Sequence, residues 1–411
     1  MLPALSSRDL VYFKKTNNLY LKVNDIVLIK KGKKYLAHRL IYMSKFLSHT
    51  SNDYIITKGD NNFKSDGKIY IKNIVGKVVK IKRNGLLLKP EHIYLIQSTL
   101  YFQEIVRVNK AFKKEKVDFV FLKGLPLHLY FEKSHPRRIY ADCDVLIYKK
   151  DKDKTFRILR ENGYKESDNA LTSILGHLKN RVTEVSFIKR VENYWIVFDI
   201  HLDAITLINQ FGKLDRVYST ENIEEINTIF LNEKRHVTIQ NEKYPILSPV
   251  NLLIYLTYNY FHHNFRGIFR LEFIYQLLEK KYKKENVLSE ILEKIKQYQL
   301  QNFVYPVFFL LEKYYDLKLP KKLFNSIRLT DDKLRYINEN ILNTNIFDSE
   351  PRIEAGINRF KNLFFLSPYP LFKRLLMIFN LQIIYSVFWV GFTKLHRRII
   401  FFARSSFSRS R

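Results

Sequence analysis

Three aspartates accompany two apolar runs that are typical of β-strands. Asp142 and Asp144 precede the run 145–147, and Asp199 ends the run 195–198. Since side chains two residues apart on a strand point to the same face, Asp142 and Asp144 are expected to lie side by side. Adjacent carboxylates resist joint ionisation, and a bound divalent cation removes that penalty. The pattern therefore predicts a Mg²⁺ (or Mn²⁺) site, which Asp199 could complete for two metal ions.

Residues suited to binding phosphate stand upstream of these aspartates. Lys123 and Gly124 follow an apolar run at 117–122, where a strand is expected to give way to a helix. A glycine there lets backbone N–H groups approach a phosphate, and the helix N-terminus adds to the attraction. Arg138, four residues before Asp142, is within reach of phosphate oxygens. An Asp-x-Asp pair alone is more often an exposed strand end, but these neighbours favour phosphate chemistry.

The elements that must position these side chains alternate between strands and helices. Apolar spacing predicts a helix over 91–114, followed by strand, helix, strand, helix and hairpin over 117–122, 125–132, 139–148, 154–162 and 185–201. That order is typical of a small α/β or α+β domain, which we place over 92–240. From 245 to 400 the pattern is mainly helical, and the Ser- and Arg-rich tail 401–411 is expected to be disordered.

The first 85 residues have a different pattern. Segments 19–30 and 69–82 are rich in β-branched and apolar residues, and turn-forming clusters lie between them. This predicts an all-β domain over 1–85, joined to the rest of the chain by a linker at 86–91. The expected fold class is therefore multi-domain: an all-β N-terminal domain, then an α/β (α+β) domain with a mainly helical C-terminal half.

The composition is that of a globular protein with a large excess of positive charge. Of 411 residues, 46% are hydrophobic and 27% charged, and 70 Lys and Arg against 40 Asp and Glu give a net charge of +30. Such a charge attracts nucleotides, nucleic acid, anionic lipid and acidic protein alike, although a solvated basic surface is the commoner explanation. The single cysteine, Cys143, excludes an internal disulfide framework and a Cys-rich zinc site, which fits a reducing compartment.

The segment that carries the aspartates resembles the uncharacterised nucleotidyltransferase family of the polymerase-β-like superfamily. The similarity lies in Leu122-Lys123-Gly124, a downstream Tyr130, and an Arg-x-x-x-Asp-x-Asp-x-Leu pattern over 138–146. A helix ending in Gly-Tyr, an Asp-x-His strand end and a helical stretch extend it over about 92–400, through 163–164, 199–201 and 252–271. The family's acidic residue after this stretch is replaced by Tyr275 or Gln276, which bears on the shape of the site more than on metal binding.

The resemblance implies an activity and a role for each residue of the pattern. The metal ions would be held by Asp142, Asp144 and Asp199, the last of which could instead act as general base. The triphosphate would be bound by Lys123, Gly124 and Arg138. The implied reaction is in-line attack of an acceptor hydroxyl on the α-phosphate of an NTP, with release of pyrophosphate. Two histidines are expected to support the site rather than to bind metal: His177 and His201.

The N-terminal segment resembles signal peptidase I and its relatives. The similarity is a series of sequence boxes in the family's order, at 1–11, 23–27, 38–41, 57–66 and 74–79. In that family a serine just before the first Met attacks the peptide carbonyl, a histidine activates the serine, and aspartates orient the histidine. By this resemblance the remnant of a peptidase site consists of His38, Asp60 and Asp66.

The serine of that family has no counterpart here, because the Met of the first box is Met1. Ser6 and Ser7 are misplaced for the role, so either the true start lies upstream or the domain is a degenerate binding module. These peptidases act outside the cytoplasm, whereas NTP is cytoplasmic, and 84–116 has no apolar run long enough to cross a membrane. We therefore expect both domains in the cytoplasm, with an inactive peptidase-like domain.

An apolar segment near the C-terminus raises the question of membrane association. Residues 375–392 include only three strongly polar side chains, and cationic residues flank them within 373–398. The length is at the lower limit for a membrane span, while the flanking cations and aromatic residues suit a membrane interface. A buried helix is the favoured interpretation, and a peripheral membrane contact through 373–398 is the alternative.

Three functions stay open at this point. The leading one is a metal-dependent nucleotidyltransferase whose partners are NTP and an unknown acceptor, which could be a protein, a peptide or a small molecule. The second is a serine endopeptidase of the signal peptidase clan, which requires a start upstream of Met1. The third is a non-catalytic adaptor at membranes or nucleic acid, which the net charge would explain.

Overall fold

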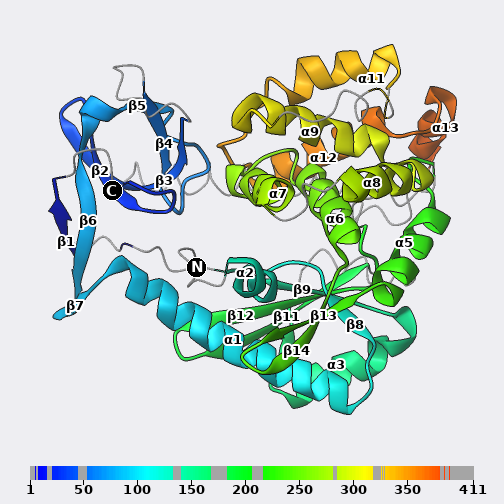
Figure 1. Cartoon of the computed structure of the whole chain (residues 1–411), viewed down its shortest axis with the longest axis horizontal. Coiled ribbons are helices and arrows are strands. Elements are labelled where there is room, and N and C mark those ends of the chain that lie inside the picture. The colour runs from blue at the N-terminus through cyan, green and yellow to red at the C-terminus, as the bar shows by residue number, and fades with distance from the viewer. Residues whose placement is uncertain are drawn as a thin grey trace, which may run out of the picture.

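The computed structural model has an N-terminal all-β region followed by a region of mixed α/β structure that ends in many helices (Figure 1). The structure describes residues 8–15, 21–44, 53–132, 140–167, 183–205, 216–280, 285–317 and 329–379, with the single positions Leu5, Asn325, Ile327, Ile384 and Phe388. The predicted order of an all-β region before an α/β region is confirmed, whereas the predicted domain boundaries stay predictions.

The N-terminal region is one antiparallel sheet of seven strands. They are β1 (Leu10–Lys14), β2 (Ile26–Lys31), β3 (Lys34–Met43), β4 (Tyr54–Lys58), β5 (Lys68–Tyr70), β6 (Ile74–Arg83) and β7 (Leu86–Leu88). The strand order is β1-β6-β2-β3-β4-β5, and β7 pairs with β6. Alternating side chains of the central strands point inward and form a buried cluster that includes Val27, Ile29, Leu40 and Ile55.

The predicted linker at 86–91 is not a linker in the structure. Leu86–Leu88 forms β7, which pairs with the end of β6, and α1 (Pro90–Lys114) begins two residues later. The turn between the strands is Asn84-Gly85, whose φ angles of 48° and 82° are those of a tight hairpin turn. An Asn-Gly pair after an apolar run is itself a hairpin signal, so this strand could have been predicted.

The α/β region is built on a second seven-stranded sheet, which is mixed. Its strands are β8 (Phe119–Phe121), β9 (Cys143–Ile147), β10 (Lys165–Glu166), β11 (Glu184–Val191), β12 (Tyr194–His201), β13 (Arg235–Ile239) and β14 (Glu242–Ile246). The order is β10-β11-β12-β9-β8-β14-β13, with parallel pairing of β12 with β9 and of β14 with β8. The β13–β14 hairpin was not predicted, because its turn residues Gln240 and Asn241 adopt positive φ without a glycine.

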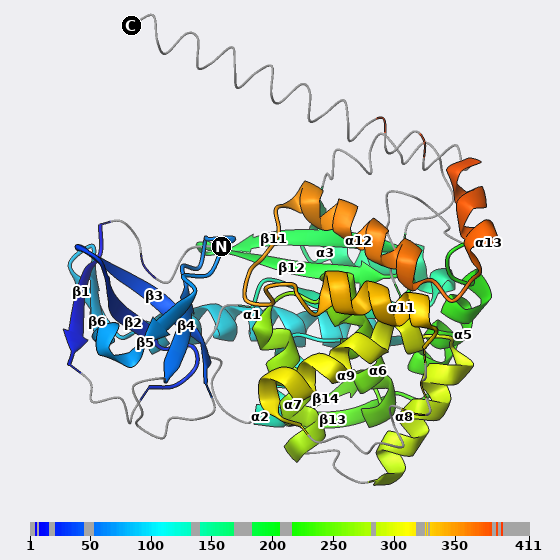
Figure 2. The ribbon, with the colours of Figure 1, turned by 90° about the horizontal axis from the view of Figure 1, so that it is seen from above.

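Helices lie on both sides of this sheet (Figures 1 and 2). The helices that belong to the α/β region itself are α1, α2 (Leu125–Glu132), α3 (Lys152–Glu161) and α5 (Thr220–Asn232). The helical half that follows contains α6 (Pro249–His262), α7 (Ile268–Lys280), α8 (Glu285–Gln297), α9 (Gln301–Tyr315), α11 (Asp331–Tyr336), α12 (Arg352–Leu366) and α13 (Leu371–Leu375). Nearly every side chain of α6 is buried, so this helix forms the centre of the helical half.

Helix α1 holds the strand ends that precede the aspartates. Gln97 donates a hydrogen bond to the carbonyl oxygen of Tyr140 at 2.7 Å, two residues before Asp142. The hydroxyl of Tyr101, which is fully buried, bonds the carbonyl oxygen of Val197, two residues before Asp199. The same helix therefore fixes the approach of both strands to the site.

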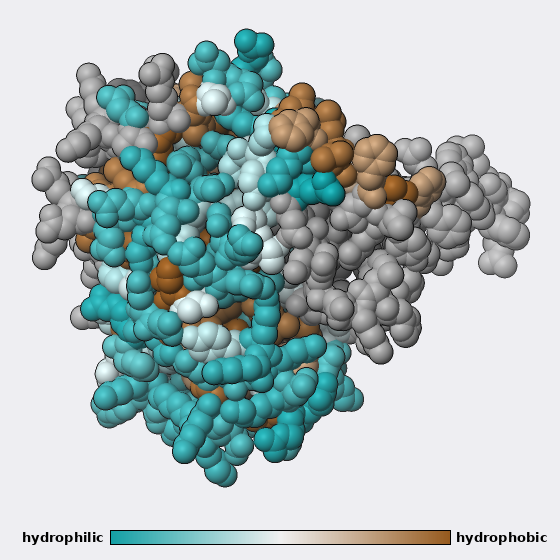
Figure 3. Space-filling view, turned by 90° about the vertical axis from the view of Figure 1, so that its right-hand side faces the viewer, coloured by the Kyte–Doolittle hydropathy of each residue, from teal (hydrophilic) through white to brown (hydrophobic). Residues whose placement is uncertain are grey.

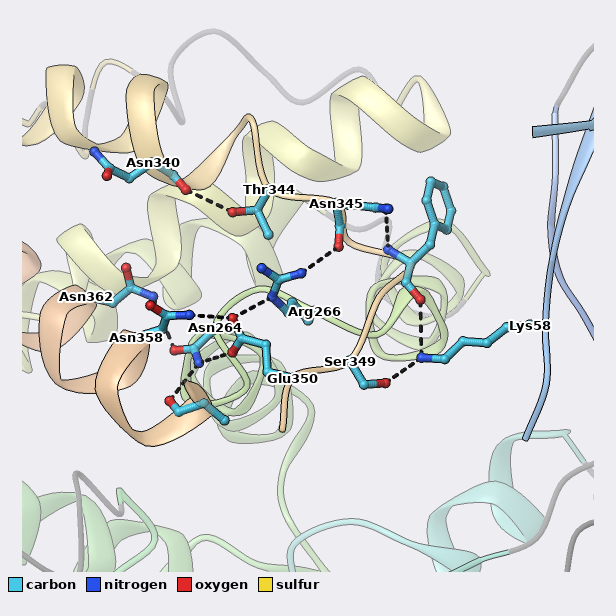
Figure 4. Close-up of polar contacts among 12 residues, drawn as sticks. Lys58, Asn264, Arg266, Asn340, Thr344, Asn345, Ser349, Glu350, Asn358 and Asn362 are labelled. Carbon is cyan, nitrogen blue, oxygen red and sulfur yellow. Dashed lines mark hydrogen bonds and ion pairs between the residues drawn. The ribbon is translucent and has the colours of Figure 1, made fainter. Parts of the chain in front are cut away.

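The loop that directly precedes α12 contacts the β region and holds it against the helical half (Figure 4). Lys58 donates to the hydroxyl of Ser349, and the backbone N–H and hydroxyl of Ser65 both lie 2.8 Å from Asp348 Oδ1. On its other side the loop is held by Glu350, whose carboxylate lies 2.9 Å from Arg266 Nε. The loop thus contacts the β region and the α6–α7 connection at once.

Removing the carboxylate of Asp348 is expected to loosen this attachment. In Asp348→Ala the two groups of Ser65 lose their acceptor, so the free energy of unfolding should fall by about 1–2 kcal/mol. Thermal unfolding of the full chain would measure the change, with Glu290→Ala on the exposed face of α8 as the matched control. Equal unfolding curves for the two variants would contradict a stabilising role for the loop.

Candidate active site

The three aspartates predicted from the sequence lie together at two neighbouring interior strands of the mixed sheet, β9 and β12. Strands β9 and β12 run parallel, and their register places Asp144 directly beside Asp199. Asp142 immediately precedes β9. One carboxylate oxygen from each of the three lies within 4.8 Å of the others, a spacing that could hold a metal ion. Two strands far apart in sequence therefore bring one acidic cluster together.

Lys123 lies against this cluster. Its Nζ is 3.2 Å from Asp144 Oδ1 and 3.7 Å from Asp142 Oδ2. Burial alone would lower the pKa of Lys123, but Asp144 and Asp142 raise it above the ordinary value, so the side chain is charged. The lysine therefore offsets part of the negative charge of the cluster.

Gly124 shapes the turn that leads from β8 into α2. Its φ of +100° is one that other residues rarely adopt, and a Cβ there would lie 3.3 Å from the carbonyl oxygen of Asp142. Two residues before Gly124, the N–H of Leu122 donates a hydrogen bond to the carbonyl oxygen of Asp144 at 3.0 Å. The turn therefore lies directly against the backbone of both aspartates.

One carboxylate oxygen in the cluster accepts no hydrogen bond from the residues that the structure describes. Asp144 is 3% exposed, and its Oδ2 is buried with no hydrogen-bond partner among the residues that the structure describes. A buried acceptor without a partner is costly, and coordination to a cation would satisfy it. The donor set, three carboxylates and no sulfur or nitrogen, suits a hard cation such as Mg²⁺. The residues present thus fit the predicted metal.

Asp199 differs from Asp144 in the direction of its pKa shift, which is upward. Burial and the nearby charges of Asp144 and Glu184 raise its pKa to about 7, while the hydroxyl of Ser186, 2.5 Å from Oδ1, opposes the shift. At neutral pH this carboxyl therefore exchanges a proton readily. A group with this pKa at the reacting centre can act as a general base, or can become a ligand when a cation displaces its proton.

Binding of a divalent cation is expected to strengthen as the pH rises through the pKa of Asp199, which is about 7. Below that pH a proton competes with the cation for the carboxylate, and above it the carboxylate is free to bind. Calorimetric titration with Mg²⁺ one unit below and one unit above would show the tighter binding at the higher pH. Asp199→Asn should abolish the dependence, and a wild-type affinity that does not change with pH would contradict the prediction.

His201 supports Asp144 from the end of β12. Its Nε2 is 3.0 Å from Asp144 Oδ1, and its Nδ1 faces Glu184 Oε2 at 3.8 Å. Burial alone would lower the pKa of His201, but Glu184 and Asp144 raise it to about 9, so the ring is charged at neutral pH. The histidine therefore fixes the orientation of the Asp144 carboxylate, and its supporting role in catalysis stays a prediction.

Two residues of this site were missed in the sequence. Glu184 and Ser186 lie on β11, where the hairpin register places them opposite His201 and Asp199. The hairpin was predicted around a three-residue turn at 191–193, whereas the turn in the structure is 192–193 and Val191 pairs with Tyr194. Counting back from the predicted turn gives a register that is one residue off, so both side chains were missed.

Two predicted residues of the site cannot be placed. Arg138 and His177 lie outside the described residues. The roles predicted for them stay predictions.

The predicted remnant of a peptidase site is brought together only in part. His38 Nδ1 lies 2.6 Å from Asp66 Oδ2, which also accepts a 2.6 Å hydrogen bond from Thr57. Asp60 instead makes a two-bond ion pair with Arg39, at 2.7 Å for each bond. The histidine and Asp66 thus form a pair, while Asp60 stabilises a neighbouring arginine.

Comparison with known proteins identifies one family. A family model described as "Uncharacterised nucleotidyltransferase" matches residues 87–316, which is more than half of the chain and includes all three aspartates, Lys123 and Gly124. No curated protein matches the chain. The nucleotidyltransferase part of the sequence resemblance is confirmed, and the peptidase resemblance of the β region stays a prediction.

Proposed function

The chain belongs to the uncharacterised nucleotidyltransferase family, and on that premise we propose that it is a metal-dependent enzyme that transfers a nucleoside monophosphate from NTP to an acceptor hydroxyl. One observation carries the proposal: three carboxylate oxygens, from Asp142, Asp144 and Asp199, lie within 4.8 Å of one another beside the Lys123-Gly124 turn. This is the grouping of charges that nucleotidyl transfer requires.

Each residue of the site has its own role in the proposed reaction. Asp142, Asp144 and Asp199 would hold a divalent cation, which when bound stabilises the charge on the attacking and leaving oxygens. Lys123 and the N–H groups of the turn at Gly124 would bind the triphosphate. The acceptor oxygen forms a bond to the α-phosphorus as the bond to the β-phosphate bridge breaks, and pyrophosphate leaves. Where Asp199 does not hold the cation, it would instead take the hydroxyl proton as general base, a role that its pKa of about 7 without a cation suits.

The first test does not require the acceptor to be known. Calorimetric titration of the full chain with each NTP, with and without Mg²⁺, should detect magnesium-dependent binding. The double variant Asp142→Ala/Asp144→Ala should lose it. Failure of the wild-type protein to bind any NTP in Mg²⁺ would overturn the proposal. Transfer itself would then be sought with α-³²P-labelled NTP and fractions of candidate acceptors, because the label stays with the transferred nucleoside monophosphate.

The β region supports a second, narrower hypothesis. The His38–Asp66 pair is arranged as the base and its orienting carboxylate are in serine peptidases. Our proposal is that the region is inactive as a peptidase and serves binding or support. A fluorophosphonate probe, which labels activated serines, should therefore leave the full chain unlabelled. Labelling that is lost in His38→Ala would instead establish the serine endopeptidase.

A further inference from the structure

The end of the described helical half carries large apolar side chains on its surface. They belong to α13 and the 3₁₀ turn Leu376–Phe379 that continues it. Phe372 and Phe379 are 70% and 77% exposed, and Leu371, Leu375 and Leu376 are between 40% and 53% exposed. We call these five residues the C-terminal apolar patch. Figure 3 shows hydrophobic surface gathered at the upper right of this face, where α13 lies.

The C-terminal apolar patch is held in a fixed orientation by its opposite face. Arg374 is 6% exposed and donates a 2.8 Å hydrogen bond to the carbonyl oxygen of Phe364 on α12. Met377 is 3% exposed and packs in the main core. The exposed residues 371/372, 375/376 and 379 recur every four positions, which places them on one side of the helical turn. The apolar side chains thus project outward from an anchored element.

The apolar surface continues along the chain instead of ending with the patch. Ile384 and Phe388, the last two described positions, are 36% and 75% exposed. The favoured sequence interpretation of 375–392 as a buried helix is therefore not supported at most of the described positions. The alternative, a contact with a membrane surface, fits these exposures.

The positive charge of the C-terminal part of the chain indicates what binds the C-terminal apolar patch. Residues 351–411 contain 11 basic side chains and one acidic one. Two copies of this chain placed patch to patch would bring two strongly positive segments together, which disfavours self-association. A bilayer with anionic lipids offers an apolar layer for the aromatic rings and phosphate groups for the cations at the same time.

We propose that the C-terminal apolar patch docks this protein on the surface of a membrane that contains anionic lipid. Phe372, Phe379 and their leucine neighbours would enter the boundary between headgroups and acyl chains. Lys373 would lie at the level of the lipid phosphates. No helix among the described residues is long and apolar enough to cross a membrane. The proposed contact is one of surface attachment through the C-terminal apolar patch, and it does not depend on the nucleotide chemistry.

Vesicle sedimentation of the full chain tests this proposal. Wild-type protein should bind vesicles of phosphatidylcholine and phosphatidylglycerol, bind vesicles of phosphatidylcholine alone much less, and be released by salt. Phe372→Ser/Phe379→Ser should weaken binding about tenfold or more, because two exposed rings are lost. The matched control is Leu86→Ser/Leu87→Ser, which removes two exposed apolar side chains from β7, 65% and 53% exposed, on the β region.

Each outcome of this experiment decides the proposal. Reduced binding of the patch variant, with normal binding of the β7 variant, supports it. Equal vesicle binding by the patch variant and the wild type overturns it, as does wild-type protein that does not bind anionic vesicles. Wild-type protein that forms dimers without vesicles, together with a monomeric patch variant, would identify the patch as an interface between copies and would also overturn it. Circular dichroism of both variants checks that they fold.

Discussion

Replacing Asp144 with Asn is expected to weaken magnesium-dependent NTP binding and transfer at least about 100-fold. Asp144 is the most buried of the three carboxylates, and its Oδ1 lies 3.2 Å from Lys123 Nζ and 3.0 Å from His201 Nε2. An amide keeps the shape of the side chain but removes the charge that a divalent cation needs. Calorimetric titration with NTP, with and without Mg²⁺, measures the change.

The same substitution should also lower the stability of the protein, and this separates Asp144 from Asp142. Without the Asp144 charge, Lys123 and protonated His201 lose their shared partner, which should cost about 2 kcal/mol or more of unfolding free energy. The side chain of Asp142 is 42% exposed. Asp142→Asn should therefore impair Mg²⁺-dependent binding with little loss of stability.

A control and a contradicting result complete this prediction. Asp153→Asn changes an exposed carboxylate at the start of α3 and should alter neither stability nor binding. Mg²⁺-dependent NTP binding that survives in both Asp142→Asn and Asp144→Asn would show that the acidic cluster is not the metal site. The nucleotide site would then have to lie elsewhere on the chain.

Local spacing was enough to predict two of the three carboxylates of the acidic cluster. The alternation of side chains along a strand places Asp142 and Asp144 on one face, and no other information is needed for that step. The position of Asp199 depends instead on the parallel pairing of β12 with β9. Apolar patterning reveals that both segments are strands, but it does not reveal which strands are neighbours. From the residues alone Asp199 could be offered only as a third carboxylate at the end of another strand, and the family resemblance gave it a role.

Contacts between distant segments lay outside any local pattern. The bonds from Lys58 to Ser349 and from Ser65 to Asp348 join positions 291 and 283 residues apart. These are ordinary polar residues in loops or at a strand end, and their sequence surroundings do not distinguish them from solvent-exposed ones. Glu184 is an intermediate case, because the hairpin register determines its partner once the turn is known. Predictability therefore fell with the sequence distance over which a contact is made.

Gly124→Ala is expected to reduce nucleotide binding and transfer about tenfold or more, although the new side chain has a single carbon. At a φ of +100° an alanine is strained, which costs about 1–3 kcal/mol. Its Cβ would also press on the carbonyl oxygen of Asp142 at 3.3 Å, so the turn or the strand end must shift. Either shift moves Lys123 relative to the carboxylates, and sites of this kind tolerate displacements of well under 1 Å.

Gly163→Ala separates backbone strain from damage to the site. Gly163 follows α3 with a φ of +84°, and a Cβ there would meet only Lys189 Cε, at an ordinary 3.6 Å. Both variants should therefore lose similar stability in thermal unfolding, because each forces an alanine into the same disfavoured backbone region. Only Gly124→Ala should lose Mg²⁺-dependent NTP binding beyond that common effect. Equal losses of binding in the two variants would mean that the 123–124 turn contributes stability alone and does not bind the nucleotide.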